Sequence, residues 1–248
     1  AYFAGVKERG YQRVDYININ IIAKNMFEKV RSKNQLAYIP FVIAGDPNEE
    51  LSLQIIDQLI ENGADGLELG LAFSDPVADG PVIQKAILRP LASNYSVESG
   101  LNLIGKVRDK YPELPIGLLT YANLVFAQGI ETFFNKCHEV GIDSVLIADC
   151  PVKEADLFAT KAQNSNIEIV FIAPPDADDK TLEQIATMSK GYTYVLSRKG
   201  ITGIEVAATK ASTDFLQKLK AHNSPPLVQG FGISEPQHVF DAANAGVD

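Results

Sequence analysis

Three carboxylates meet in one short stretch of the chain, in an arrangement typical of acid–base chemistry. Glu68 lies between Leu67 and Leu69 in an apolar run, and Asp75 and Asp79 follow it closely. A carboxylate that points into an apolar interior costs free energy unless it has a partner or a task. Burial also raises its pKa toward the range that suits a general acid–base group. By position alone, Glu68 fits equally well as an ion-paired residue at a strand end or as one that faces a helix cap.

The two aspartates lie in a loop, residues 72–81, that is rich in turn-forming residues. Pro76 and Pro81 restrict the backbone of this loop. An aspartate beside proline or glycine is commonly a turn or N-cap residue, so Asp79 could cap a helix that starts near Pro81. Turn chemistry alone explains less well why three carboxylates meet at one strand end and its loop. We therefore interpret the segment as a candidate catalytic site.

Short apolar segments typical of β-strands alternate with longer amphipathic segments along the chain. The apolar segments are apolar on both faces, as parallel strands covered by helices on both sides are. Strands are expected at residues 36–44, 66–70, 116–120, 144–148, 167–173, 192–196 and 227–231. The intervening segments predict helices. One example is the apolar-periodic run at 51–60, which follows Asn48 and stops at Gly63.

One joint recurs where helices end and strands begin: a glycine, an apolar residue and an aspartate, at 63–65, 141–143 and 246–248. This recurrence indicates a repeated βα unit, and unbroken alternation over this length favours a (β/α)8 TIM barrel over a doubly wound sheet. We expect one barrel domain over residues 21–248, C-terminally incomplete because the eighth strand should start at Asp248. Residues 21–32 predict a helix that covers the N-terminal end of the barrel, and residues 1–20 form an extension to which we assign no role.

The overall composition excludes several classes of function. The 248 residues carry a net charge of −9 with scattered basic residues, so a nucleic-acid surface is not expected. There is no apolar run of about eighteen residues for a membrane span and no secretory signal. Two cysteines, Cys137 and Cys150, form neither a disulfide framework nor a metal-ligand pattern. A cytoplasmic protein without a metal site is expected.

In a barrel the chemistry takes place at the C-terminal ends of the strands. Glu68 and the loop to Asp79 fulfil this condition. The glycine-containing segment 197–203 is either a lid or a plain surface loop. Gly230 and Gly232 offer backbone amides of the kind that barrel phosphate sites use, although two glycines alone are weak evidence.

Five motifs in register make the chain similar to the tryptophan synthase alpha subunit family. They are PFVIAGDP at 40–47, LELGLAFSDPVADG at 67–80, PIGLLTYAN at 115–123, SRKGITG at 197–203 and QGFGI at 229–233. The resemblance runs from about residue 22 to the end without evident gaps. It implies a (β/α)8 barrel and a lyase of tryptophan biosynthesis, which splits indole-3-glycerol phosphate into indole and glyceraldehyde 3-phosphate.

The resemblance also implies which residues form the site. The two catalytic carboxylates of the family fall on Glu68 and Asp79, and its phosphate-binding amides fall partly on Gly203 and Gly232. Its site lining falls on Phe41, Ile83, Tyr121, Leu146, Ala148, Ile172, Tyr194, Thr202, Phe231 and Ile233. No cofactor is implied in this chain. The implied partner is a beta subunit that contains pyridoxal phosphate and receives indole through a tunnel, in an alpha2beta2 tetramer.

The chain departs from the family pattern at two points. Ala72 stands where the family usually has proline, which affects the stiffness of the loop and the coupling to the partner. The family continues beyond the position of Asp248 into an eighth strand, a Gly-Ser phosphate-binding turn and a last helix, so we expect the natural protein to continue as well. Two alternative functions remain open: a regulatory subunit that chiefly activates the beta subunit, and another phosphate-binding barrel such as a phosphosugar isomerase.

Overall fold

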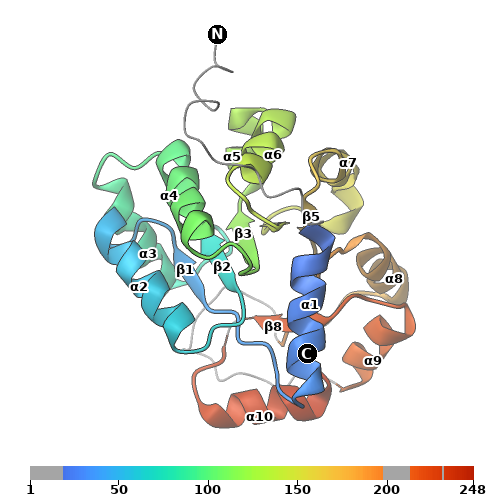
Figure 1. Cartoon of the computed structure of the whole chain (residues 1–248). Coiled ribbons are helices and arrows are strands. Elements are labelled where there is room, and N and C mark those ends of the chain that lie inside the picture. The colour runs from blue at the N-terminus through green and yellow to red at the C-terminus, as the bar shows by residue number, and fades with distance from the viewer. Residues whose placement is uncertain (1–18, 198–212, 231) are drawn as a thin grey trace.

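The predicted alternation of strands and helices is present in the computed structural model, and its strands form a parallel ring surrounded by helices (Figure 1). The structure describes residues 19–197, 213–230 and 232–248. Its strands are β1 Phe41–Ile43, β2 Leu67–Gly70, β3 Ile116–Thr120, β4 Ser144–Ile147, β5 Glu168–Val170, β6 Ile172–Ala173, β7 Thr193–Leu196 and β8 Leu227–Gly230. In the described ranges, none of the helices is both long and apolar enough to span a bilayer.

The helices follow the strands in the order expected of βα units. They are α1 Ile19–Ser32, α2 Glu49–Glu61, α3 Pro81–Leu91, α4 Val97–Lys110, α5 Ala122–Gln128, α6 Ile130–Glu139, α7 Asp156–Asn164, α8 Asp179–Met188, α9 Thr213–Ala221 and α10 Pro236–Ala245, with a short 3-10 helix at Val152–Glu154. The predicted punctuation of α2 is confirmed: the Asn48 side chain accepts a hydrogen bond from the Leu51 amide, and Gly63 has a φ of +97°.

The strands pair in parallel in two arcs, β1-β2-β3-β4-β5 and β6-β7-β8. Each of the seven predicted strand segments contains a strand, and the segment at 167–173 contains two because the pairing is interrupted at Phe171. The first predicted strand is shorter than expected, since pairing begins only at Phe41; the preceding residue, Pro40, has no N–H to donate to a ladder. Phe231, the last residue of the seventh predicted segment, lies outside the described residues.

Asp248 connects the β8 edge of one arc with the segment that precedes β1 in the other. Its amide donates to the Leu227 carbonyl oxygen of β8 at 2.9 Å, and its carbonyl oxygen accepts from the Ala37 amide at 2.9 Å. The ring is that of a (β/α)8 barrel.

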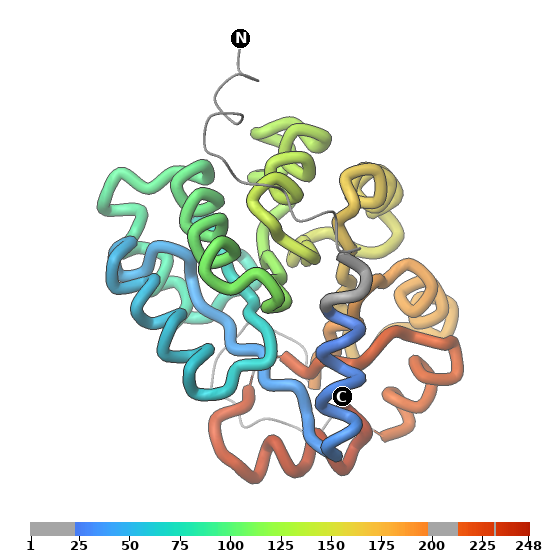
Figure 2. Tube along the Cα trace, viewed as in Figure 1, coloured from blue at the N-terminus to red at the C-terminus, as the bar shows by residue number. Residues whose placement is uncertain are grey.

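Helix α1 covers the N-terminal end of the ring, as predicted, and lies across the strands in the views of Figures 1 and 2. Met26 and Phe27 are buried there against Leu146, Val170 and Tyr192, which point into the barrel interior. The inner apolar cluster beneath the candidate site is thus completed by a helix that precedes the first strand.

The recurring glycine and aspartate joint has one structural role at all three places. Gly63, Gly141 and Gly246 end their helices with positive φ angles of +97°, +79° and +103°, a region that favours glycine. The aspartate that follows accepts a backbone N–H of the adjacent strand segment: Asp65 from Tyr38 at 3.0 Å, Asp143 from Ile116 at 2.7 Å and Asp248 from Leu227 at 2.9 Å. These carboxylates satisfy amides at the N-terminal rim of the barrel and fix the entry of each strand.

Arg108 binds the carboxylate of Asp143 and two nearby carbonyl oxygens, so the stability of this joint depends on Arg108. Its guanidinium donates to Asp143 at 2.7 Å and to the carbonyl oxygens of Gly141 and Leu114 at 2.9 and 2.7 Å. Burial raises the pKa of Asp143 to about 6 even with this cation beside it. Without the guanidinium, the buried carboxylate would lose its only charged partner among the described residues and would keep the Ile116 amide, and the two carbonyl oxygens would lose the Arg108 donor.

Replacing Arg108 with methionine is therefore expected to lower the free energy of unfolding by about 3–5 kcal/mol, the usual effect of removing one partner from a buried ion pair. Urea unfolding monitored by circular dichroism measures this change. Lys106→Met is the matched control, because Lys106 and its partner Glu49 are each more than half exposed. It should lower the stability by less than about 1 kcal/mol. Equal effects of the two variants would contradict the assignment.

Candidate active site

Glu68 lies in the barrel interior on β2. It is only 6% exposed, and its level in the sheet is set by pairing with Phe41 of β1 and Gly117 of β3. Among the residues that the structure describes, no cation pairs with it. Burial raises its pKa to about 7, although a hydrogen bond from Tyr192 lowers it in part. Near neutral pH this carboxyl group can therefore both donate and accept a proton.

Tyr192 contacts Glu68 directly, although the sequence did not single it out. Its hydroxyl donates to Oε1 of Glu68 at 3.0 Å and is itself hydrogen-bonded by Ser144. Burial and the nearby Glu68 raise the pKa of Tyr192 well above its usual value, so the phenol stays neutral. Gly117 provides the space for this contact, since a Cβ there would come within 3.3 Å of the Tyr192 hydroxyl. The signal was available in the strand alternation, because Tyr192 precedes the predicted site residue Tyr194 by two positions.

Asp79 is held by Tyr121, which stands just after β3. The carboxylate is 4% exposed, and its Oδ2 accepts from the Tyr121 hydroxyl at 2.6 Å. The same hydroxyl accepts from the Ala78 amide at 3.2 Å. The sequence also allowed Asp79 to be the N-cap residue of the next helix. In the structure Gly80 is the N-cap residue of α3, so Asp79 does not have that role. The carboxylate is thus fixed by a residue of the neighbouring strand end.

Two cavities extend from the barrel strands to the surrounding loops and helices, and Tyr194 lines both. One, of about 470 Å³, is lined by Asp79 and mostly apolar residues; the other, of about 410 Å³, is lined by Glu68 and Phe41. Both carboxylates contribute to raising the pKa of Tyr194, after burial itself. Gly230 makes room for its ring, since a Cβ at 230 would lie 1.7 Å from the Tyr194 hydroxyl. Tyr194 therefore lies between the cavity lined by Asp79 and the cavity lined by Glu68.

Most of the other expected site residues in the described ranges line these cavities. Leu146, Ala148 and Ile172 line the cavity of Asp79, and Phe41 and Ile233 line that of Glu68. Ile83 instead packs in a separate apolar cluster with Ile43, Ala72 and Ile87. Gly232 is buried just after β8 with a φ of +78°. Thr202, Gly203, Phe231 and the 197–203 segment beyond Ser197 lie outside the described residues.

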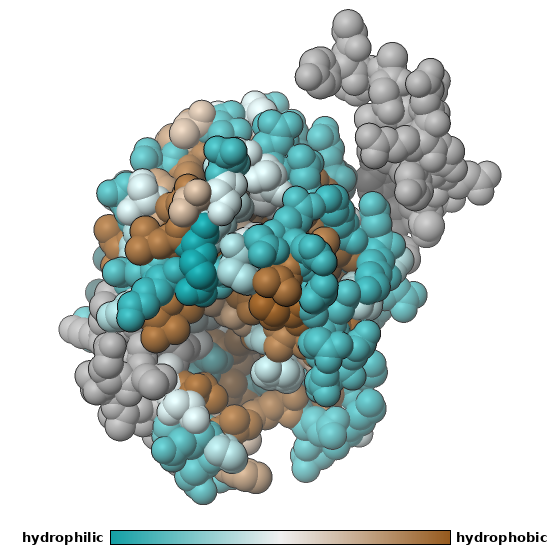
Figure 3. All heavy atoms as spheres, turned by 90° about the vertical axis from the view of Figure 1, so that its left-hand side faces the viewer, coloured by the Kyte–Doolittle hydropathy of each residue, from teal (hydrophilic) through white to brown (hydrophobic). Residues whose placement is uncertain are grey.

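The walls of the two cavities are chiefly apolar. Figure 3, which views the molecule from the side of α2 and α3, shows apolar side chains gathered around a hollow. Within the part of the chain that the structure describes, no group of three or more His, Cys, Asp or Glu side chains could hold a metal ion. An apolar enclosure with a few fixed polar groups is typical of a site for a mainly aromatic or aliphatic ligand.

Comparison with known proteins gives a consistent result. The family model described as tryptophan synthase alpha chain matches residues 27–248. The tryptophan synthase alpha chain of Proteus mirabilis (strain HI4320) is 53% identical over 220 residues, which cover 89% of this chain and 82% of that protein. The corresponding chain of Francisella tularensis subsp. tularensis (strain WY96-3418) is 51% identical over 221 residues, covering 89% and 82%.

Solved structures agree with these relatives. The tryptophan synthase subunit alpha of Legionella pneumophila str. Paris superimposes with a TM-score of 0.79 at 29% identity, covering 90% of this chain and 82% of that one. A chain of the tryptophan synthase a2b2 complex of Pyrococcus furiosus gives a TM-score of 0.77 at 32% identity, covering 85% and 84%. The similarity thus extends over the barrel and includes Glu68 and the loop to Asp79.

Proposed function

The chain belongs to the tryptophan synthase alpha chain family, and from this premise we propose that Glu68 and Asp79 cleave indole-3-glycerol phosphate into indole and glyceraldehyde 3-phosphate. The observation that carries the proposal is the buried Glu68 on β2, whose pKa is raised to about 7 while its one described hydrogen bond comes from the neutral Tyr192. Such a group can supply and recover a proton within one reaction cycle.

The reaction is a retro-aldol cleavage. Protonated Glu68 gives its proton to carbon 3 of the indole ring, which makes that carbon a leaving group. The Glu68 carboxylate then takes the proton of the glycerol hydroxyl, the carbon–carbon bond breaks, and its electron pair restores the aromatic ring. Before the bond breaks, the ring is positively charged, and this charge extends to its N–H. The fixed carboxylate of Asp79 stabilises that charge as it develops.

The cavity walls suit this substrate. The indole ring would lie among Leu146, Ala148, Ile172 and Tyr194, and the phosphate would bind backbone amides that include Gly203 and Gly232.

The partner in this proposal is the beta subunit of tryptophan synthase, in an alpha2beta2 tetramer. The similarity to a chain of the Pyrococcus furiosus a2b2 complex supports it. The chain itself would need no cofactor, and pyridoxal phosphate would be bound by the beta subunit. A cytoplasmic location fits the two free cysteines, of which Cys137 is buried.

The direct test is release of indole from indole-3-glycerol phosphate by the purified protein, with and without a beta subunit. We expect indole formation by the chain alone and faster formation in the complex. Stimulation of the beta reaction without indole formation would instead favour a regulatory subunit. Turnover of a phosphosugar without cleavage of indole-3-glycerol phosphate would favour another phosphate-binding barrel.

Tyr192→Phe is expected to shift the pH dependence of cleavage. The mechanism requires protonated Glu68, so kcat/KM should fall as the pH rises through about 7. The Tyr192 hydrogen bond stabilises the carboxylate and lowers its pKa, so its loss should move this decline to higher pH by about one unit. The pH profile of kcat/KM measures the shift. Tyr111→Phe, at a tyrosine whose hydroxyl bonds Asp57 of α2 and lies outside both cavities, should leave the profile unchanged. A decline that stays in place or moves to lower pH in Tyr192→Phe would contradict the role of Tyr192.

A further inference from the structure

The loop that carries Asp79 is contacted by two tyrosine hydroxyls, one near each end. Tyr121 binds the end of the loop, at Ala78 and Asp79. Tyr95 binds its beginning, where its hydroxyl accepts from the Ala72 amide at 3.3 Å. Ala72 follows β2 closely and is only 4% exposed, so its N–H is shielded from solvent. A buried amide without an acceptor is destabilising, which makes the Tyr95 hydroxyl an important partner.

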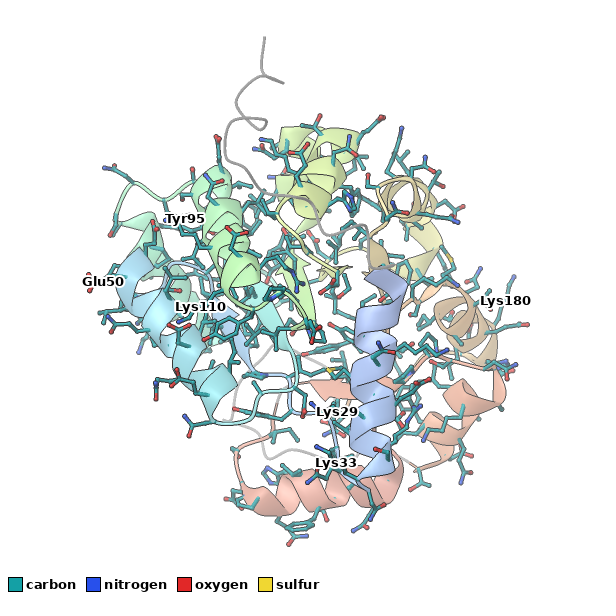
Figure 4. The ribbon with its side chains drawn as sticks, in the orientation of Figure 1. Lys29, Lys33, Glu50, Tyr95, Lys110 and Lys180 are labelled. Carbon is teal, nitrogen blue, oxygen red and sulfur yellow. The ribbon has the colours of Figure 1, made fainter. Side chains whose placement is uncertain are left out.

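The fold provides a fitted position for the Tyr95 ring. Figure 4 labels this residue at the turn between α3 and α4. A Cβ at Gly100 of α4 would come within 2.2 Å of the Tyr95 hydroxyl, and a Cβ at Gly45, after β1, within 3.2 Å of the ring. Two glycines from different segments thus leave the space in which the hydroxyl reaches Ala72. Burial raises the pKa of Tyr95 to about 12, so the hydroxyl is neutral near pH 7.

The surroundings of Tyr95 also connect the two ends of the loop. Tyr95 packs against a small apolar cluster that contains Ala72, at the start of the loop, and Ile87. Ile87 belongs to α3, which begins at Pro81, two residues after Asp79. The residues at the start of the loop and the helix that follows its end therefore pack in the same apolar cluster.

We propose that Tyr95 is a positioning residue for Asp79: its hydroxyl holds the Ala72 amide, and thereby sets the direction in which the catalytic loop leaves β2. This inference rests on the proposed function, because it requires that Asp79 acts on the substrate. A proline at position 72 would restrict the backbone through its ring. In this chain the hydrogen bond between the Tyr95 hydroxyl and the Ala72 amide restricts the backbone instead. The two devices exclude one another, since a proline ring carbon would occupy the space between the backbone nitrogen and the Tyr95 hydroxyl.

The first test is Tyr95→Phe in the full chain. Amide hydrogen exchange at Ala72 should become faster, and kcat should fall by about tenfold with KM little changed, because a misdirected Asp79 weakens stabilisation of the transition state. In the Asp79→Asn background the same substitution should have almost no further effect on kcat, since Tyr95 acts through Asp79. Tyr111→Phe is the matched control. Tyr111 stands at the end of α4 and its hydroxyl bonds Asp57 of α2, so its loss should leave kcat unchanged.

The second test replaces the hydrogen bond between Tyr95 and Ala72 by a proline ring at position 72. Ala72→Pro alone should lower both stability and kcat, because the ring meets the Tyr95 hydroxyl. Adding Tyr95→Phe should recover much of both losses, so that the double variant is better than Ala72→Pro alone. Additive losses in the double variant would overturn the proposal.

The outcomes separate this inference from the proposed function. Faster exchange at Ala72 with unchanged kcat in Tyr95→Phe would show that the bond exists without positioning Asp79, and would overturn the inference alone. Unchanged exchange at Ala72 would overturn it as well. Full cleavage activity of Asp79→Asn would instead overturn the assigned role of Asp79, whatever the exchange data show.

Discussion

Replacing Glu68 with glutamine is expected to reduce cleavage of indole-3-glycerol phosphate by about 100- to 10,000-fold, the usual contribution of a positioned general acid–base group. Glutamine has nearly the same shape and can still bond the Tyr192 hydroxyl, but it can neither give a proton to carbon 3 nor take one from the glycerol hydroxyl. Steady-state indole release at saturating substrate measures the loss. Near wild-type turnover by the folded variant would exclude Glu68 as the proton shuttle.

The same substitution should also change how stability depends on pH. The folded-state pKa of Glu68, about 7, lies above its ordinary value of 4.5. The unfolded chain therefore loses this proton first, and the wild type loses stability as the pH rises from about 4.5 to 7. Glu68→Gln lacks this effect and should be more stable than the wild type above pH 7 by up to about 3 kcal/mol. Urea unfolding at pH 5 and pH 8 measures the difference and confirms that the inactive variant is folded.

Glu168 offers a matched control for Glu68. It is also buried, at the start of β5, and burial raises its pKa to about 7 as well. It lies near the N-terminal rim of the barrel, where Glu168 and Gly191 line a separate cavity beside α1. Glu168→Gln should therefore alter the pH dependence of stability and leave cleavage unchanged. Equal losses of activity in the two variants would mean that burial of a carboxyl group, and not its position, determines the effect.

Replacing Asp79 with asparagine is expected to reduce kcat by about 100- to 1,000-fold, as the loss of one fixed electrostatic group at a reacting centre commonly does. The amide can still accept from the Tyr121 hydroxyl, so the loop should keep its position. It has no net negative charge, so the positive charge on the indole ring is less stabilised in the transition state. Because the substrate is neutral at that ring before protonation, KM should change little. The separate values of kcat and KM for indole release test this.

Asp75→Asn is the control within the same loop. Asp75 is exposed and bonds the neighbouring Ser74 hydroxyl, so its change removes the same charge from the same segment without touching a cavity. It should keep near wild-type activity. If Asp75→Asn and Asp79→Asn lost activity equally, the net charge of the loop would be the cause and the specific role of Asp79 would be wrong.

The sequence was sufficient for the barrel because its determinants are local. Glycine at a helix end and aspartate at a strand start act within a few residues, and their recurrence predicted the repeated unit that the structure contains. The interruption at Phe171 could not be predicted, since it depends on how two arcs of strands meet. The start of β1 at Phe41 was missed for a different reason: Pro40, which has no N–H to donate, was visible in the sequence but was included in the predicted strand.

The site was predictable in its residues but not in its contacts. Glu68 was prominent as a carboxylate in an apolar strand, and the loop motif singled out Asp79. Their tyrosine partners flank other strands, β7 and β3: Tyr192 is 124 positions from Glu68, and Tyr121 is 42 positions from Asp79. No local pattern encodes such pairings. Ala72 was recognised as a departure from the family, whereas the Tyr95 hydroxyl that binds its amide became visible only in three dimensions.

The joint at Asp248 has a consequence for the order in which the barrel folds. Its carboxylate binds Arg31, 217 positions earlier, and its backbone bonds Ala37, ahead of β1, and Leu227 of β8. Contacts between sequence neighbours form readily, whereas closing a loop of this length costs about 5 kcal/mol of chain entropy before any contact is gained. The βα units can therefore assemble as an open, curved sheet before Asp248 comes into contact with the segment ahead of β1. This seam should stabilise the native state mainly by slowing its unfolding, with little effect on the rate at which the chain first collapses.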